Sequence, residues 1–352
     1  MKSWGTVTAR THHGDEEHSC EGYRRSFECD APLKMDFHTQ FDVASLTKII
    51  FTTNMIMLSV DRGLLKVDDC VQRYLPAWGS ADKGMITVRD LLEHQSGLQP
   101  WLPLYVRSHS PEDAHQVIAT SQLACQPRQK RIYSDLGFIV LGQILTSIYR
   151  ASLEEIFTEN LKDELGLKNT QFSVPINSNN VAATSFGDSF EMNMISTGIP
   201  YKVSEQLNEF SNWRHQILEG EINDGNAFHL FEGTSSHAGL FSDASDLLNL
   251  TRVYLDAFNE DRVFKSQTVR AFLEIGYDPM QCMGFRTWPI STQDGVVTIY
   301  GHTGFTGVAF GFSPQLNFSA VMLTNKLHTQ AEIIKTDDMW IPFLESSLSK
   351  KQ

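Results

Sequence analysis

The segment at residues 41–58 constrains the fold of this chain more than any other. A short apolar lead-in runs into a long apolar stretch, residues 49–58, and Gly63 then supplies a helix stop. Ser45 and Lys48 stand at the start of this predicted helix. Because residues three apart share one face of a helix, we expect the two side chains to lie side by side at the N-terminal end of a buried helix.

Ser45 and Lys48 also carry chemistry. A neutral lysine amine beside a serine hydroxyl can accept its proton and make the oxygen a nucleophile, and a helix N-terminus adds positive partial charge and N–H donors. The alternative is a core helix with an incidental Ser and Lys, but a buried lysine without a partner is costly. The same spacing at residues 80–83 and 347–350 lies in a polar connection and at the C-terminus, where catalysis is not expected.

A second candidate is Tyr133, just before an apolar helical pattern at residues 135–149. Ser134 or Asp135 can cap that helix, and the phenol can then point into a cleft. A tyrosine near a lysine ammonium ionises more easily and serves as a general base or acid. The alternative is a core tyrosine beside an ordinary helix cap.

A third candidate is the run His302-Thr303-Gly304 in a β-rich tail. Turn residues separate strands expected at residues 296–300, 308–312 and 318–323. Gly304 lets a backbone approach a ligand closely, so a strand here could offer its N–H and C=O groups to a substrate amide or ester. The alternative is a glycine-rich hairpin with a chance histidine.

Taken in this order, the three motifs resemble the serine β-lactamase and penicillin-binding-protein superfamily, most closely its class C β-lactamase, DD-carboxypeptidase and esterase branch. Further stretches resemble the same branch at residues 62–76, 86–98, 236–242 and 323–328. The likeness spans residues 4–345. It implies an α/β (α+β) fold of the β-lactamase/transpeptidase-like type, with a central antiparallel sheet flanked by helices and a mostly helical lobe.

The resemblance also implies roles for the motif residues. Ser45 is then the acylated nucleophile, which Lys48 activates in concert with Tyr133. The backbone N–H groups of Ser45 and Phe305 form the oxyanion hole.

At two supporting positions the chain departs from the family pattern. Asp135 stands where many members have Asn, and an ionised Asp accepts hydrogen bonds but donates none; a bond to Lys48 is expected there rather than one that positions a substrate amide. His302-Thr303-Gly304 occupies the place of Lys-Thr-Gly, and a neutral histidine lacks the fixed charge that lysine offers a substrate carboxylate.

The resemblance therefore implies a serine hydrolase that acts through an acyl-enzyme on small-molecule or peptide-derived esters or amides. The two departures favour an esterase or amidase over an efficient β-lactamase. A D-amino-acid-specific peptidase or a weak β-lactamase is one alternative. A non-catalytic scaffold or ligand sensor with a vestigial site is another, although Ser45, Lys48 and Tyr133 are all present.

Composition narrows the partners. The 352 residues, 41% of them hydrophobic, suffice for one large globular unit. A formal net charge of −13 argues against a nucleic-acid partner, and no stretch has the length and purity of a membrane helix. No Cys/His cluster has the spacing of a zinc site, so neither a metal nor a cofactor is expected.

The N-terminus lacks the apolar segment of a signal peptide. This predicts a cytoplasmic protein, or a periplasmic one if an export signal has been removed. The chain also lacks the opening helix that commonly precedes the first strand in the family. The last helix, expected at residues 329–348, then covers the sheet alone, or a partner chain such as a second copy fills the gap.

We expect one domain, residues 1–352, in two lobes. Residues 1–40 and 281–352 form the sheet lobe, and residues 41–280 form the mostly helical lobe. Helices are expected at residues 45–62, 87–95, 135–149, 153–161 and 243–258. Residues 172–235 are a long polar stretch, and since loops of that length usually carry function, we expect this one to wall the active site.

Overall fold

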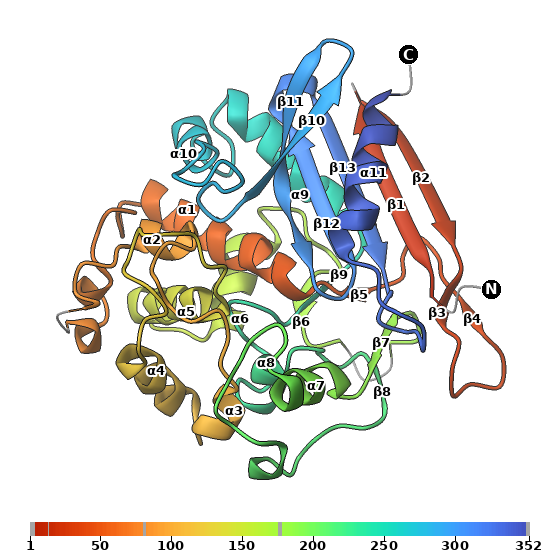
Figure 1. Ribbon diagram of the computed structural model, residues 1–352. Coiled ribbons are helices and arrows are strands. Elements are labelled where there is room, and N and C mark those ends of the chain that lie inside the picture. The colour runs from red at the N-terminus through yellow and green to blue at the C-terminus, as the bar shows by residue number, and fades with distance from the viewer. Residues whose placement is uncertain (1–3, 13, 80–81, 175–177, 350–352) are drawn as a thin grey trace.

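A six-stranded antiparallel sheet forms the centre of the molecule (Figure 1). The computed structural model describes residues 4–349, apart from residues 13, 80–81 and 175–177. In spatial order the strands are β10 (Arg286–Thr292), β11 (Gly295–Gly304), β12 (Val308–Ser313), β13 (Phe318–Thr324), β1 (Thr6–His12) and β2 (Asp15–Glu21). Strand β1, near the N-terminus, pairs with β13 of the C-terminal part of the chain, from Thr6 opposite Thr324 to His12 opposite Phe318.

Alternation along the strands gives the sheet two apolar faces. On one face Trp288 packs with Trp340 and Leu344 of α11 (Thr336–Ser349). On the other, Phe312 packs with Tyr254 of α9 (Ala244–Asn259). Figure 1 shows α11 in front of the sheet and α9 behind it, so helices cover both faces. The last helix is shorter than predicted, because it begins only at Thr336.

The remaining helices form the second part of the molecule, on the left and below the sheet in Figure 1. The predicted helix at 45–62 is a composite of a 3-10 turn η1 (Ala44–Leu46), a π-helix η2 (Lys48–Thr53) and α1 (Asn54–Asp61). The other helices in this part are α2 (Val88–Leu92), α3 (Leu104–Arg107), α4 (Pro111–Thr120), α5 (Asp135–Tyr149), α6 (Leu153–Phe157), the π-helix η5 (Thr158–Lys162) and α10 (Ser266–Phe272), with 3-10 turns η3 (Val71–Arg73) and η4 (Pro76–Trp78). The predicted helix at 87–95 ends early, because His94 adopts a left-handed conformation with a φ of 58°.

Smaller sheets tie the loops to this frame. In the most important of them β9 (Leu240–Ser242) lies between β5 (Phe41–Asp42) and β6 (Gln171–Phe172). The others pair β3 (Tyr23–Arg25) with β4 (Leu33–Lys34), and β7 (Ala183–Phe186) with β8 (Ile217–Glu219). Because β5 precedes the Ser45 turn, the pairing of β5 with β9 brings residues 236–242 against that turn.

The stretch at residues 172–235 is not the single loop that its composition predicts. It contains β7, β8, α7 (Ser189–Thr197), the 3-10 turn η6 (Leu207–Glu209) and α8 (Gly225–His229). A buried ion pair joins these elements, with Arg214 Nη2 2.6 Å from Asp188 Oδ1. Arg214 Nη1 also donates to the Ile222 carbonyl at 2.7 Å. A buried charge network therefore joins the elements of this stretch.

The expected fold class, a central antiparallel sheet flanked by helices, is confirmed.

Two further Ser–Lys spacings occur at residues 80–83 and 347–350. Lys83 caps the end of α4 by donating to the carbonyls of Ile118 and Ala119. Ser80 and Lys350 lie outside the described residues. No single helix in the described ranges is long and apolar enough to cross a membrane; one pair bent by 77°, Asp135–Tyr149 with Leu153–Lys162, passes that test jointly. The cysteines at 20, 29, 70, 125 and 282 are all unpaired thiols.

Candidate active site

Ser45 lies in a tight turn that its neighbours impose. The buried carboxylate of Asp42, at the end of β5, accepts the N–H of Ala44 at 2.8 Å and that of Asn223 at 2.7 Å. Burial raises the pKa of Asp42 to about 6, against the effect of these two hydrogen bonds. Ala44 has a φ of 46°, in the left-handed region that alanine rarely adopts. This strained turn presents Ser45 to a cavity and starts the helix that carries Lys48.

Lys48 is fully buried and all its donors have partners. Its Nζ donates to Ser45 Oγ at 2.9 Å and to the His237 carbonyl at 3.0 Å. Asp135 Oδ1 lies 2.8 Å from the same nitrogen, as an ion pair without the alignment of a hydrogen bond. The i, i+3 spacing read from the sequence thus brings the lysine to the serine, and Asp135 joins them from the start of α5.

The charges around Lys48 decide its protonation. Burial alone lowers the pKa of the amine, but the negative charge of Asp135, with a further contribution from Tyr133, outweighs burial and raises the pKa above its ordinary value. In the resting site Lys48 is therefore an ammonium ion. The neutral amine that the sequence argument assumed is the minor form at neutral pH.

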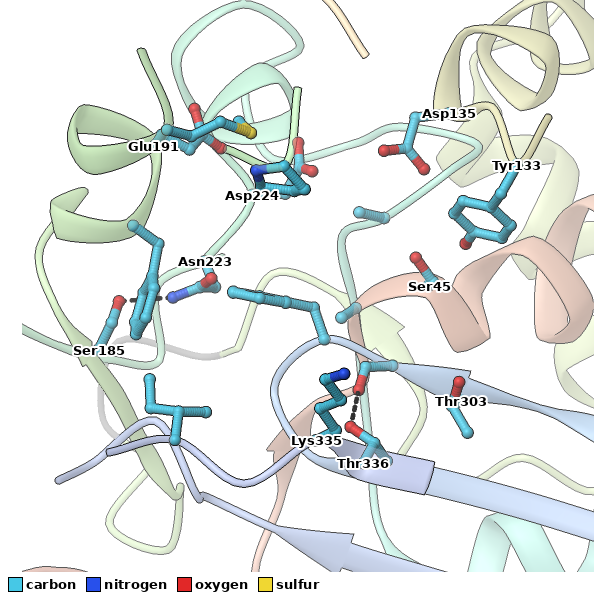
Figure 2. A pocket seen from close by; sticks show the side chains of 18 of the residues that line it. Ser45, Tyr133, Asp135, Ser185, Glu191, Asn223, Asp224, Thr303, Lys335 and Thr336 are labelled. Carbon is cyan, nitrogen blue, oxygen red and sulfur yellow. Dashed lines mark hydrogen bonds between the residues drawn. The ribbon is translucent and has the colours of Figure 1, made fainter. Parts of the chain in front are cut away.

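Tyr133 lies beside this pair, close enough for the side chains of Ser45 and Lys48 to influence its pKa. Its ring centroid is 5.2 Å from Lys48 Nζ. Ser134 caps α5 by accepting the Gly137 N–H at 3.3 Å, which sets Tyr133 immediately outside the helix. Figure 2 shows its hydroxyl on the side of Ser45. Burial raises the pKa of Tyr133, although the charge of Lys48 opposes the shift, so the phenol too keeps its proton at neutral pH.

Strand β11 brings the third motif to the other side of the serine. His302 Nδ1 lies 2.7 Å from the Thr303 carbonyl, and burial together with Lys48 lowers the pKa of His302 well below its ordinary value. Thr303 Oγ1 accepts a hydrogen bond from Arg286 Nη1 at 2.8 Å, and Arg286 also pairs with Asp337 at 2.9 Å. Although His302 is neutral, β10 thus places a permanent positive charge beside Thr303. No motif in the sequence indicates this charge.

The end of β11 approaches the serine turn closely. A Cβ on Gly304 would lie only 2.7 Å from the carbonyl oxygen of Val43, so the close contact requires glycine. Ser45 and Phe305 both line the cavity that opens at this contact. The arrangement is compatible with the predicted oxyanion hole of their two N–H groups, which stays a prediction.

A cavity of about 730 Å³ opens in front of Ser45 (Figure 2). Its lining is apolar in part, including the exposed side chains of Ile199, Phe305 and Ile334. Part of the stretch at 172–235 forms one wall and leaves the cavity open. The lining also includes cationic groups that no motif indicated, which are Arg131, Arg286, Lys326 and Lys335.

Carboxyl groups line the wall that faces the serine. Figure 2 shows Glu191 and Asp224 across the cavity from Ser45. Despite burial, the charge and hydrogen bond of His237 lower the pKa of Asp224 to about 2, while burial and then Asp224 raise the pKa of Glu191 to about 8. His237 Nε2 lies 3.0 Å from Asp224 Oδ1. Within the described part of the chain, no three or more His, Cys, Asp or Glu residues are grouped to hold a metal ion.

The sequence motifs account for only part of this site. They identify Ser45, Lys48, Tyr133 and Asp135, which the structure brings together, and the run at 302–304, which lies alongside. Arg286 and Asp224 come from segments without a motif, and only the pairing of β10 with β11 and the folding of residues 183–229 bring them here. The sequence analysis assigned Arg286 only to the sheet lobe, residues 281–352, and no motif marked it as a site residue.

The chain is similar to known proteins in both sequence and structure. The chain matches the family model described as Beta-lactamase over residues 5–340. It is 30% identical over 334 residues to N-acetylmuramyl-L-alanine amidase of Bacillus subtilis (strain 168), covering 88% of this chain and 74% of that protein. It is 29% identical over 333 residues to a putative D-alanyl-D-alanine carboxypeptidase of Escherichia coli (strain K12), covering 87% and 74%. A class C β-lactamase structure from Rhodobacter sphaeroides superposes with a TM-score of 0.68 at 19% identity, covering 97% of this chain and 94% of that one.

Proposed function

This chain belongs to the β-lactamase family of hydrolases, and from that premise we propose that it works through an acyl-enzyme ester on Ser45. One observation carries the proposal. Lys48 Nζ lies 2.9 Å from Ser45 Oγ, with the Tyr133 ring centroid 5.2 Å from the same nitrogen, in front of an open cavity. A vestigial site has no need to keep a buried lysine fully paired beside an accessible serine.

Acylation forms one bond and breaks another. Ser45 Oγ attacks the carbonyl carbon of the substrate as its proton passes to the Lys48–Tyr133 pair, and the N–H groups of Ser45 and Phe305 bind the oxyanion. The carbonyl–leaving group bond then breaks, and the same pair returns the proton to the leaving alcohol or amine. Water repeats these steps to release the acid and restore Ser45.

The proton balance gives this reaction a pH dependence. Attack on the substrate needs a base, and the raised pKa values of Lys48 and Tyr133 leave both groups protonated at neutral pH. The population with one proton removed grows as the pH rises. We therefore propose that activity increases from neutral to alkaline pH.

The substrate class that the site supports is a small or peptide-derived ester or amide. The apolar rim formed by Ile199, Phe305 and Ile334 suits an acyl or leaving group with an apolar part. The names of the two relatives, an amidase and a putative carboxypeptidase, support the amide and peptide side of this class.

A carboxylate-bearing peptide is the second candidate, because Arg286 stands beside Thr303. Asp337 neutralises part of that charge, so we place this candidate after simple esters and amides. Arg286→Gln should raise KM for a peptide with a free C-terminal carboxylate by about tenfold, the value of one charge-assisted hydrogen bond. The substitution should leave KM for a neutral ester unchanged. An equal rise in KM for both substrates would exclude a role of Arg286 in binding the carboxylate.

The test of the function is a ranking of substrates. Short-chain p-nitrophenyl esters should be hydrolysed faster than nitrocefin, and peptides ending in D-Ala should be compared with their L-Ala counterparts. Ser45→Ala should abolish all of these activities. Wild-type protein that cleaves none of these substrates would favour the scaffold alternative, and faster turnover of nitrocefin would favour a β-lactamase.

A further inference from the structure

His94 contacts the segment around Tyr133 at two points. Its carbonyl accepts the N–H of Ile132 at 2.8 Å, and its Nδ1 accepts the N–H of Ser134 at 3.1 Å. One residue therefore binds the backbone on both sides of Tyr133. His94 is 1% exposed and lies outside the cavity lining, so it does not touch a substrate there.

The ring of His94 also packs against the phenol. Its centroid is 4.5 Å from that of Tyr133 and 5.3 Å from that of Phe138. Because Nδ1 accepts a hydrogen bond from an N–H group, the ring proton is on Nε2. The neutral form needed for this contact is favoured, since burial and the charge of Lys48 lower the pKa of His94 well below its ordinary value.

The backbone of His94 adopts a left-handed conformation. Its φ of 58° lies in a region that is uncommon for residues other than glycine, although histidine, asparagine and aspartate are enriched there. This conformation ends α2 and turns both the carbonyl and the side chain toward residues 132–134. Backbone bonds from Arg128 to Gln95, at 2.7 Å, and from Asp135 to Pro100, at 2.9 Å, join the same two loops. Replacing the His94 side chain should therefore leave the loops paired.

We propose that His94 is a positioning residue that fixes the Tyr133 hydroxyl against Ser45 and Lys48. The inference deepens the proposed function and rests on it. His94 acts through Tyr133: the two backbone contacts set the position of the Tyr133 Cα, and the His94 ring, packed against the phenol at an interplanar angle of 41°, sets its direction. Without the side chain, Tyr133 gains rotational freedom just where proton transfer needs a fixed distance.

Two variants distinguish the loss of the His94 side-chain hydrogen bond from a general loss of folding. His94→Leu removes the acceptor at Nδ1. His94→Asn offers an amide oxygen in its place and tolerates the left-handed backbone. His328→Leu is the matched control, because His328 is also a buried histidine that accepts a backbone N–H, that of Ser26 at 3.0 Å, and it does not line the cavity.

The readout is the rate of Ser45 acylation by p-nitrophenyl acetate, with kcat and KM measured separately and folding checked by circular dichroism. His94→Leu should lower kcat about a hundredfold with KM nearly unchanged, as a misplaced catalytic group does. His94→Asn should recover most of that loss. His328→Leu should lower the melting temperature and leave kcat within about twofold of wild type, as expected of a substitution away from the reacting groups.

The outcomes are distinguishable. A folded His94→Leu protein with wild-type kcat overturns the inference, and so does an Asn variant as slow as the Leu variant. Equal losses of kcat in His94→Leu and His328→Leu would indicate a general structural effect and also overturn it. Wild-type protein that is never acylated would overturn the proposed function itself, and the inference with it.

Discussion

At the scale of single residues, the chemistry depends on how Asp135 sets the charge of Lys48. The carboxylate lies 2.8 Å from the lysine nitrogen and raises the pKa of Lys48. Its charge also raises the pKa of Tyr133. An uncharged amide at position 135 would raise neither pKa. The Asp therefore makes the deprotonated form of the Lys48–Tyr133 pair harder to populate at neutral pH.

Replacing Asp135 by Asn should therefore make the site more active at neutral pH. Below the pKa of the base, kcat/KM of the wild type should rise about tenfold per pH unit between pH 7 and 10. Loss of an opposite charge at this distance lowers a lysine pKa by at least about one unit, so Asp135→Asn should be about tenfold faster at pH 7. The measurement is the pH profile of kcat/KM for p-nitrophenyl acetate, with Ser45→Ala as the blank.

Asp278→Asn is the matched control for this substitution. It removes a carboxylate that pairs with Arg131 at 2.8 Å, at the edge of the same cavity, without touching Lys48. Its profile should follow that of the wild type. An Asp135→Asn profile that does not move, or that moves to higher pH, would contradict the role given to Asp135.

At the scale of elements, the wall formed by α7, β8 and α8 depends on one buried ion pair. Asp188 and Arg214 are 1% and 5% exposed, and His229 Nε2 lies 2.9 Å from Asp188. Burial opposes the ionised form of Asp188, but hydrogen bonds from His229 and Arg214 lower its pKa to about 2 from the ordinary 3.8. These charges act together with a small apolar cluster in the same part of the chain, formed by Val181, Ile222, Ala227, Ala238 and Phe241.

Arg214→Leu should destabilise this wall. It removes the guanidinium from the buried carboxylate of Asp188 and leaves His229 beside it, which costs about 3 kcal/mol in the free energy of unfolding. Because the folded-state pKa of Asp188 is depressed, the contribution is present above pH 4 and is lost as the pH falls through 2. Urea unfolding of wild type and variant should show the difference at pH 6 and a smaller one near pH 2. A difference that does not depend on pH would contradict this account.

The elements also show what can be read from the sequence. The composite helix at 45–62 and the helix at 135–149 were predictable, because their apolar spacing and caps are local. The elements within 172–235 were not, because the Asp188–Arg214 pair that orders them joins residues 26 positions apart. For the same reason Ser45, Lys48 and Tyr133 could be named from motifs, whereas Arg286 and Asp224 reach the cavity only through long-range pairing.

At the scale of the whole molecule, we propose that the two lobes are a single domain. One buried cluster runs from Val7 of β1 through Leu46 and Leu141 to Leu323 of β13, so the sheet and the helical part share a core. Within the sheet, the N-terminal strand β1 pairs with β13 from the C-terminal part of the chain. Neither lobe can unfold without exposing apolar surface of the other.

Thermal unfolding should accordingly be one cooperative transition. Far-ultraviolet circular dichroism, tryptophan fluorescence and residual esterase activity should lose their signals at the same midpoint. A first transition that removes activity while the sheet signal persists would show that the helical lobe unfolds by itself.

The most direct test of the central claim is covalent labelling of Ser45. Intact-protein mass spectrometry after treatment with a fluorophosphonate should show one adduct on the wild type, and peptide mapping should place it on Ser45. Ser185→Ala, which removes another serine hydroxyl from the cavity lining, should still be labelled, while Ser45→Ala and Lys48→Ala should not react. An adduct that persists in Ser45→Ala, or a wild-type protein that takes up no label between pH 7 and 10, would contradict the account.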